Sequence, residues 1–361
     1  MNMRISEIDL LRFTAAMMVV FFHYTFRGFA ADGLSDVGFP ELAPISQYGF
    51  LGVELFFMIS GFVILMTASS GSLRKFAISR IVRLYPAFWF GCTLTFVAIL
   101  TLGTDRFKAS TGQYLINLTM LNEFINVPSI DGVYWTLAVE IKFYLFIAGI
   151  LIIRQIDKVQ RYLVLWLGLT IILEFLPSYM LSQILNTRFA PFFIVGALSY
   201  LVYSQGWTKL RAALYVISSV LALHAAFNSS KRYAQYYQTD FDPFIVGALV
   251  TSFIFVMILI SMRKLGAIAK YDWRVLGALT YPVYLIHQNI GFMILNALNQ
   301  RVERFLLLAI TIFAILSMAY LIQMYIERPL AARMKSLLSR RLFSSDIKSD
   351  DGKINYTAEI R

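Results

Sequence analysis

Ten apolar stretches, each close to the length that crosses a bilayer, recur along the 361-residue chain. A helix that spans the roughly 30 Å hydrocarbon core needs about 20 mainly apolar residues. The sequence therefore predicts an all-α membrane protein, a bundle of about ten transmembrane helices. The predicted spans cover residues 8–28, 48–69, 84–103, 133–153, 162–178, 187–204, 212–228, 242–262, 275–298 and 305–326.

Composition agrees with a membrane protein and leaves little room for a soluble domain. Of all residues, 58% are hydrophobic and 15% are charged, whereas soluble domains average about 45–50% and about 25%. The net charge of +11 is explained by basic cytoplasmic loops, so we expect no nucleic-acid partner. Cys92 is the single cysteine, which excludes an intrachain disulfide and a cysteine-based metal site.

The distribution of lysine and arginine predicts the orientation in the membrane. With the N-terminus inside, 23 of the 32 cations fall on the inner side, eight fall on the outer side, and Lys142 lies within a span. Positive loops stay in the cytoplasm, so both termini are expected there. Residues 1–333 are expected to form one transmembrane domain, and residues 334–361 a cytoplasmic tail without fixed structure.

The first apolar stretch carries two costly side chains, Arg12 and His23. At about 1.5 Å and about 100° per residue, their spacing separates them by about 16 Å along a helix and only about 20° around it. Ionisable residues inside a membrane helix are functional candidates by default. Two simpler interpretations stay open, because Arg12 can reach lipid headgroups and His23 can bond a neighbouring helix.

Two further groups of ionisable residues lie in or beside predicted spans. Arg80 and Arg83 are three residues apart, so on a helix they share a face and can bind phosphate groups. The alternative is ordinary cytoplasmic charge. Glu140 lies about a third of the way into the span that begins near Trp135, and it needs a partner or a wet cavity. Lys142 faces away from it.

Other residues are weaker candidates for a supporting role. Glu54 either lines a binding site for an acceptor substrate on the outer side or caps a helix end. Ser60 belongs to a small-residue pair that favours close helix packing. Tyr284 and His287 share a helix face. His287 either pairs with Glu140 or bonds a backbone carbonyl. The sequence contains no glycine-rich phosphate loop, clustered metal site or nucleophile elbow.

Six sequence features, in this order, resemble the acyltransferase 3 family of integral-membrane acyltransferases. They are Arg12 with His23 eleven residues on, GVELFFMISGF at 52–62, Arg80 and Arg83 before LYP, WTLAVEIKFY at 135–144, YPVYLIH at 281–287, and ERP at 327–329. The resemblance covers residues 4 to about 333. Each motif is loose alone, but their order together with ten spans makes the resemblance specific.

The resemblance implies a multi-pass protein of the bacterial inner membrane that uses cytoplasmic acyl-CoA, commonly acetyl-CoA, as donor and no metal. The acceptor is typically a hydroxyl of a cell-surface or exported carbohydrate, and polysaccharide-assembly proteins are possible partners. The resemblance implies that His23 is catalytic, that Arg12 belongs to the same motif, and that Glu140 is the intramembrane acid. Arg80 and Arg83 would contact CoA phosphates. The supporting candidates are Glu54, Ser60, Trp135, Tyr284 and His287.

Competing functions remain open from the sequence. A transporter or flippase for a glycan or lipid-linked intermediate also uses intramembrane ionisable residues. A sensor or scaffold explains those residues poorly. Within an acyltransferase, His23 can act either as a general base on the acceptor hydroxyl or as a nucleophile that carries the acyl group.

Overall fold

The computed structural model describes residues 5–350 and the side chains of residues 5–339. Every regular element in this part of the chain is helical, as expected where the backbone must satisfy its own hydrogen bonds in lipid. The elements are α1 (Ser6–Phe22), η1 (His23–Arg27), α2 (Gly28–Ala30), α3 (Ala43–Ser46), η2 (Gln47–Leu51), α4 (Gly52–Ala68), α5 (Leu73–Leu102), α6 (Thr111–Asn117), η3 (Asn122–Ile125), η4 (Gly132–Tyr134), α7 (Trp135–Ile152), η5 (Ile156–Lys158), α8 (Val159–Phe175), α9 (Tyr179–Leu185), α10 (Ala190–Gln205), α11 (Lys209–Tyr237), α12 (Pro243–Ser261), α13 (Gly266–Ala269), α14 (Arg274–Leu298), α15 (Arg304–Ile322), η6 (Gln323–Glu327) and α16 (Arg328–Asp350).

Eight helices of the described residues are long and apolar enough to cross a membrane, against ten predicted spans. The helices that occupy the other two predicted spans are α8 and α14. Helix α8 has 17 residues, which is at the short end of spanning length. Helix α14 has His287, Gln288 and Asn289 in its middle, and these side chains are buried against protein. The all-α membrane fold is therefore supported, while the number ten and the side of each terminus remain predictions.

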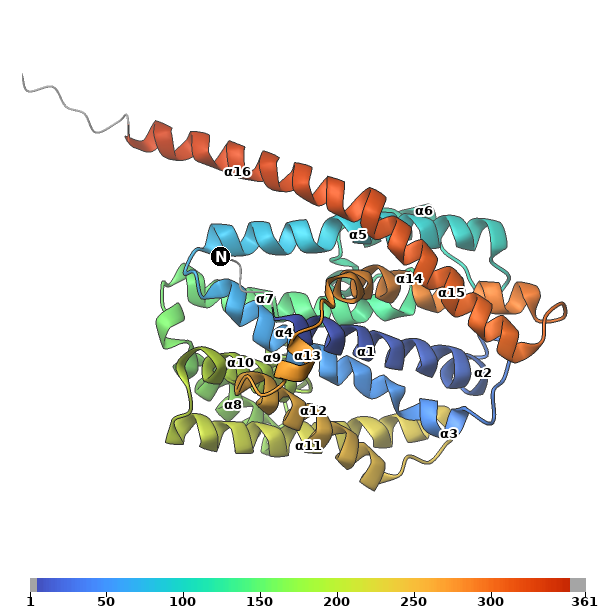
Figure 1. Cartoon of the computed structure of the whole chain (residues 1–361), viewed down its shortest axis with the longest axis horizontal. Coiled ribbons are helices and arrows are strands. Elements are labelled where there is room, and N and C mark those ends of the chain that lie inside the picture. Colours follow the sequence, from blue (N-terminus) through green and yellow to red (C-terminus); the bar gives the residue numbers. More distant parts are fainter. Residues whose placement is uncertain (1–4, 351–361) are drawn as a thin grey trace, which may run out of the picture.

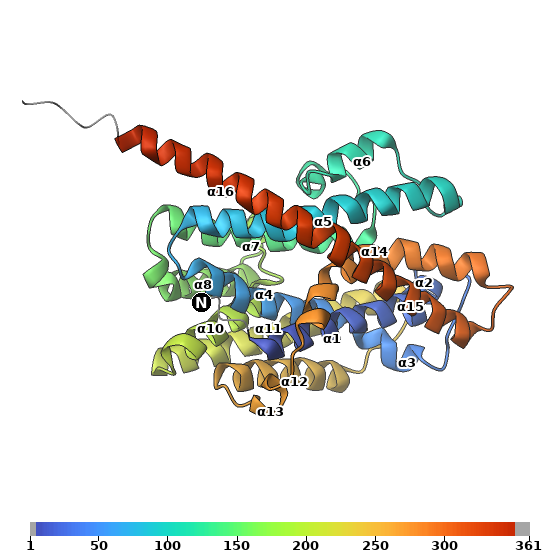
Figure 2. The ribbon, with the colours of Figure 1, turned by 45° about the horizontal axis from the view of Figure 1, so that its top comes forward.

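Helix α1 lies inside the bundle, packed against α4 and α14 (Figures 1 and 2). The span that contains α4 is 78% buried, whereas the span formed by α11 is only 33% buried. Large apolar side chains such as Phe313 and Val216 are exposed on the outer helices, which fits a surface that faces lipid rather than water. The interior helices thus place the Arg12 and His23 stripe away from lipid.

Helices α4 and α10 approach so closely that their backbones touch at two glycines. A Cβ atom at Gly196 would lie 1.8 Å from the Met58 carbonyl oxygen, and one at Gly61 would lie 2.1 Å from that of Phe193. Small residues permit this approach in membrane helices. The tight contact fixes one wall of the bundle next to the candidate site.

Two membrane helices end in a π-helical turn. The segment His23–Arg27 continues α1, and the Gly28 amide donates to the carbonyl of His23. The segment Gln323–Glu327 continues α15 in the same way. Such turns rotate the side chains that follow and frequently occur at functional sites.

Helix α16 packs on α5 and then leaves the bundle (Figure 1). The predicted boundary between residues 333 and 334 falls within this helix, which runs to Asp350. The prediction of an unstructured tail extends to residues 351–361, which lie outside the described residues.

Candidate active site

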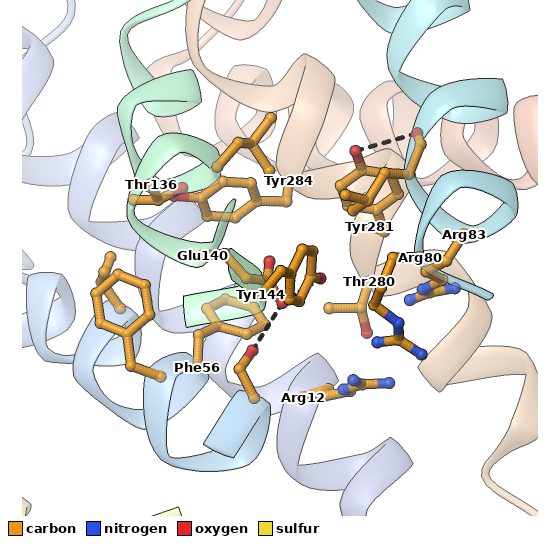
Figure 3. Close-up of a pocket in the computed structure, with 15 residues that line it drawn as sticks. Arg12, Phe56, Arg80, Arg83, Thr136, Glu140, Tyr144, Thr280, Tyr281 and Tyr284 are labelled. Atoms are coloured by element: carbon orange, nitrogen blue, oxygen red, sulfur yellow. Dashed lines mark hydrogen bonds between the residues drawn. The ribbon is translucent and has the colours of Figure 1, made fainter. Parts of the chain in front are cut away.

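A pocket lies among five helices, α1, α4, α5, α7 and α14 (Figure 3). The space between these helices that protein atoms leave free amounts to about 690 Å³, part of which is open to solvent. The lining residues are Arg12, Val53, Phe56, Phe57, Ser60, Arg80, Arg83, Leu84, Thr136, Leu137, Glu140, Tyr144, Thr280, Tyr281 and Tyr284. Six of the ten predicted site residues therefore meet in one place.

The guanidinium groups of Arg12, Arg80 and Arg83 gather on one side of this pocket (Figure 3). Arg80 Nη2 donates to Thr67 Oγ1 at 3.2 Å, and Arg83 Nη1 lies 3.2 Å from Glu327 Oε1. The positive charge of Arg12 is close enough to those of Arg80 and Arg83 to be repelled by both. Three cations around one cavity form a site suited to an anionic ligand such as a phosphate ester.

Glu140 faces the same pocket and is held by two hydroxyl groups. Its Oε1 atom accepts hydrogen bonds from Tyr144 Oη at 2.8 Å and from Ser60 Oγ at 3.0 Å. Lys142 turns away, as predicted, and donates to the Gln183 carbonyl at 2.9 Å. Glu140 therefore gains its intramembrane stabilisation from hydroxyl donors, with Arg12 within electrostatic range.

Tyr284 connects the pocket to a second group of polar residues. Its hydroxyl lies 2.9 Å from Thr136 Oγ1, and its ring stands edge-on to Phe56 with 5.5 Å between centroids. The centroid of the same ring lies 5.6 Å from that of the His287 imidazole. Tyr284 thus stands between the arginine-lined pocket and the histidines.

His23 and His287 form a buried pair. The Nε2 atom of His287 lies 3.2 Å from Nδ1 of His23. His287 is 0% exposed and His23 is 3% exposed. His287 Nδ1 is 2.9 Å from the Tyr284 carbonyl. Of the two alternatives left open by the sequence for His287, the structure thus shows the bond to a backbone carbonyl.

The hydrogen bonds assign the proton positions on both rings. A carbonyl oxygen only accepts, so His23 Nδ1, at 2.7 Å from the Val19 carbonyl, must carry the proton. His287 Nδ1 carries a proton for the same reason, which leaves its Nε2 atom to accept from His23. The lone pair of neutral His23 is therefore on Nε2. That atom is the one available to take a proton or attack a carbonyl.

Sequence reasoning missed a third member of this group, Arg27. Its Nη1 atom lies 3.3 Å from His23 Nε2, and its Nε atom donates to Asp32 Oδ2 at 2.7 Å. The i,i+4 spacing of His23 and Arg27 was a usable signal, because such residues neighbour each other on a helix. Counting Arg27 only as an outer-side charge concealed it.

Asp131 was also missed, although it anchors α14 beside His287. Its two carboxylate oxygens accept from the backbone amides of Asn289 at 3.0 Å and Val133 at 3.2 Å. The side chain is fully buried. Burial raises the pKa of the Asp131 carboxyl from about 3.8 to about 7, although the two amide donors act in the opposite direction.

The pKa of Asp131 predicts a pH dependence of stability. Because the folded pKa is raised, the folded protein binds more protons than the unfolded chain between about pH 4 and about pH 7. The free energy of unfolding should therefore fall as pH rises through this window. Asp131→Asn should flatten the slope and also lower stability, since an amide nitrogen would then face a donor. Thermal unfolding of detergent-solubilised protein across this window measures both; equal slopes in the two proteins would contradict the prediction.

Two predicted site residues lie outside the pocket and the histidine pair. Glu54 is buried in α4, and its Oε2 atom has no hydrogen-bond partner among the described residues. Trp135 begins α7, and its ring packs 5.5 Å from that of Phe189. Neither residue lines the pocket. Among the described residues, no three His, Cys, Asp or Glu side chains lie close enough together to hold a metal ion.

Comparison with known proteins identifies one family model and two relatives that match this chain. A family model described as "Acyltransferase domain" matches residues 5–324. The putative acetyltransferase ORF330 of Acidianus two-tailed virus is 24% identical over 276 residues, 72% of this chain and 80% of that protein. Nodulation protein 10 of Rhizobium leguminosarum bv. viciae is 26% identical over 224 residues, 56% of this chain and 58% of its own length. No solved structure matches this chain significantly.

Proposed function

The chain belongs to the acyltransferase 3 family, and from this premise we propose that it transfers an acetyl group from cytoplasmic acetyl-CoA to a carbohydrate hydroxyl. The acceptor is a cell-surface or exported glycan, and the enzyme lies in the bacterial inner membrane with both termini in the cytoplasm. The name of one relative, a putative acetyltransferase, supports the choice of acyl group. The bias of lysine and arginine supports the orientation.

The arginine-lined pocket is the proposed donor site. Acyl-CoA carries several phosphate charges at one end and its thioester at the other. Arg80, Arg83 and Arg12 would bind the phosphate end, because guanidinium groups match phosphate oxygens in geometry and charge. The thioester would then point along α1 toward Tyr284 and the histidines, following the stripe that joins Arg12 to His23.

His23 is the proposed catalytic base, and the observation that carries this assignment is the 2.7 Å contact between its Nδ1 atom and the Val19 carbonyl oxygen. The bond from Nδ1 to the Val19 carbonyl leaves the Nε2 lone pair for chemistry. His287 accepts from the same Nδ1 atom, so it would hold the ring in place and stabilise the charged imidazolium. Glu140 would orient the donor within the pocket, since its hydroxyl partners fix its position.

The reaction balances without a further reactant. His23 Nε2 takes the proton from the acceptor hydroxyl while the acceptor oxygen bonds to the thioester carbonyl carbon. The carbon–sulfur bond then breaks, and the CoA thiolate receives the proton from the imidazolium. In the rival route, Nε2 attacks the thioester first and an acetyl-histidine passes the group to the acceptor.

Transfer of label from acetyl-CoA tests the function. Purified protein in lipid nanodiscs, supplied with [¹⁴C]acetyl-CoA and glycan from the host strain, should place alkali-labile label on the glycan. Mass spectrometry of surface polysaccharide from strains with and without the gene would then identify the modified sugar. Movement of glycan across the membrane without label transfer would instead support a transporter.

A further inference from the structure

The guanidinium of Arg27 is held at the reactive nitrogen of His23 from the side opposite His287. Its Nη1 atom lies 3.3 Å from His23 Nε2, and Asp32 binds its Nε atom at 2.7 Å. The side chain is 24% exposed and that of Asp32 is 10% exposed. Arg27 is thus fixed by a carboxylate at Nε, while its Nη1 atom lies at the His23 nitrogen to which the acceptor hydroxyl would bind.

We propose that Arg27 is a catalytic residue that stabilises the negative charge on the thioester carbonyl oxygen during transfer. This inference rests on the proposed acyl transfer and adds a residue to it. When the acceptor oxygen bonds to the carbonyl carbon, the π electron pair of the C=O bond moves onto its oxygen. That oxyanion forms next to the acceptor hydroxyl, which is itself bound to His23 Nε2. A donor that now contacts Nε2 is therefore within a small shift of the oxyanion.

The local backbone explains how a residue four positions from His23 reaches its nitrogen. Residues His23–Arg27 form a π-helical turn, in which side chains advance differently from those of an α-helix. Across this turn, Arg27 Nη1 lies 3.3 Å from His23 Nε2. Asp32 serves as the positioning residue. It also accepts from Tyr236 Oη at 3.3 Å, so the carboxylate stays in place beside the guanidinium.

The ion pair leaves Arg27 with the donors that the reaction needs. Asp32 uses Nε, so the Nη1 and Nη2 hydrogens remain for the oxyanion and the acceptor. In the resting enzyme Nη1 occupies the His23 lone pair, which the acceptor hydroxyl takes over on binding. When the oxyanion collapses, the electron pair returns to the carbonyl and the CoA thiolate leaves.

The test compares Arg27→Gln, Arg27→Lys and Arg27→Ala with the wild type in the label-transfer assay. For Arg27→Gln we expect kcat to fall by about 10²–10³, the usual effect of removing one oxyanion donor. The KM for acetyl-CoA should stay within about twofold, since the donor binds elsewhere.

Arg27→Lys keeps the charge and the bulk, so it should retain part of the rate. Added guanidinium should partly restore Arg27→Ala, an effect that a merely structural role would not produce. Arg301→Gln, which removes an exposed outer arginine, is the matched control.

The outcomes separate this inference from the proposed function. A wild type that transfers no label refutes the function itself. A wild type that transfers label while Arg27→Gln keeps its kcat refutes only the role of Arg27, as does a loss in Arg27→Ala that guanidinium fails to restore. If Arg27→Gln does not fold, judged by monodispersity and thermal unfolding, Arg27→Lys and guanidinium rescue decide the question.

Discussion

Replacing His23 with alanine is expected to reduce acetyl transfer by at least about 10³-fold, because both proposed routes need its Nε2 atom. The KM for acetyl-CoA should change little, since the arginines proposed to bind the donor line the pocket and do not contact His23. Initial rates of label transfer, measured at equal amounts of folded protein, give the comparison. The loss is expected at every acceptor concentration, because both ring nitrogens of His287 are engaged, one with the Tyr284 carbonyl and the other with His23.

His224→Ala is the matched control for this prediction. His224 is the third histidine of the chain, and its side chain is 53% exposed on α11, 3.5 Å from Glu174. Its removal should leave the rate unchanged. Full activity in His23→Ala would contradict the catalytic assignment and return His23 to a structural role.

The two routes through His23 can be distinguished with the same protein. Incubation of the wild type with acetyl-CoA in the absence of acceptor should leave His23 unmodified if the residue is a base. Intact-mass and peptide analysis would detect an acetyl group on His23 if the residue is a nucleophile. Because an acyl-imidazole hydrolyses readily, the sample must be quenched and digested rapidly.

The location of the long helices could be predicted from the sequence, because lipid imposes one length and one kind of backbone on every span. Each predicted span contains a helix. The number of spans differs at α8, which has only 17 residues, and at α14, whose Tyr284, His287, Gln288 and Asn289 are polar yet buried. Mean hydropathy identifies a membrane helix by its apolar side chains. It therefore identifies helices that face lipid well, and it identifies poorly a helix whose polar side chains are buried against protein.

The site could be predicted only where a residue was costly by itself. Arg12, Arg80, Arg83 and Glu140 were identified as unusual in or beside a span, and the structure brings them to one pocket. The pairing of His23 with His287 joins positions 264 residues apart, which no local pattern specifies. Arg27 was missed because it was counted only among the outer-side charges, although its i,i+4 spacing from His23 was a usable signal.

Removing both Arg80 and Arg83 is expected to raise the KM for acetyl-CoA by about 10²-fold or more, since a hydrogen bond to a charged group contributes about 1.5–3 kcal/mol. The value of kcat should change much less, because the proposed reacting atoms lie beyond Tyr284. Titration of nanodisc-embedded protein with acetyl-CoA and with CoA, by initial rates and by calorimetry, measures both quantities. Replacement of the exposed cations Arg161 and Lys209 by alanine removes the same charge elsewhere and is the control.

The single substitutions should differ, because the two arginines have different partners. Arg83 is paired with Glu327, whereas Arg80 bonds the hydroxyl of Thr67. Arg83→Ala would therefore leave a carboxylate unpaired near the phosphates and should weaken CoA binding more than Arg80→Ala does. Adding Glu327→Gln to Arg83→Ala should recover part of the loss, because it removes the repulsion. Equal affinities in all these variants and the wild type would mean that the arginines only mark the cytoplasmic side. Donor binding would then have to be sought outside this pocket.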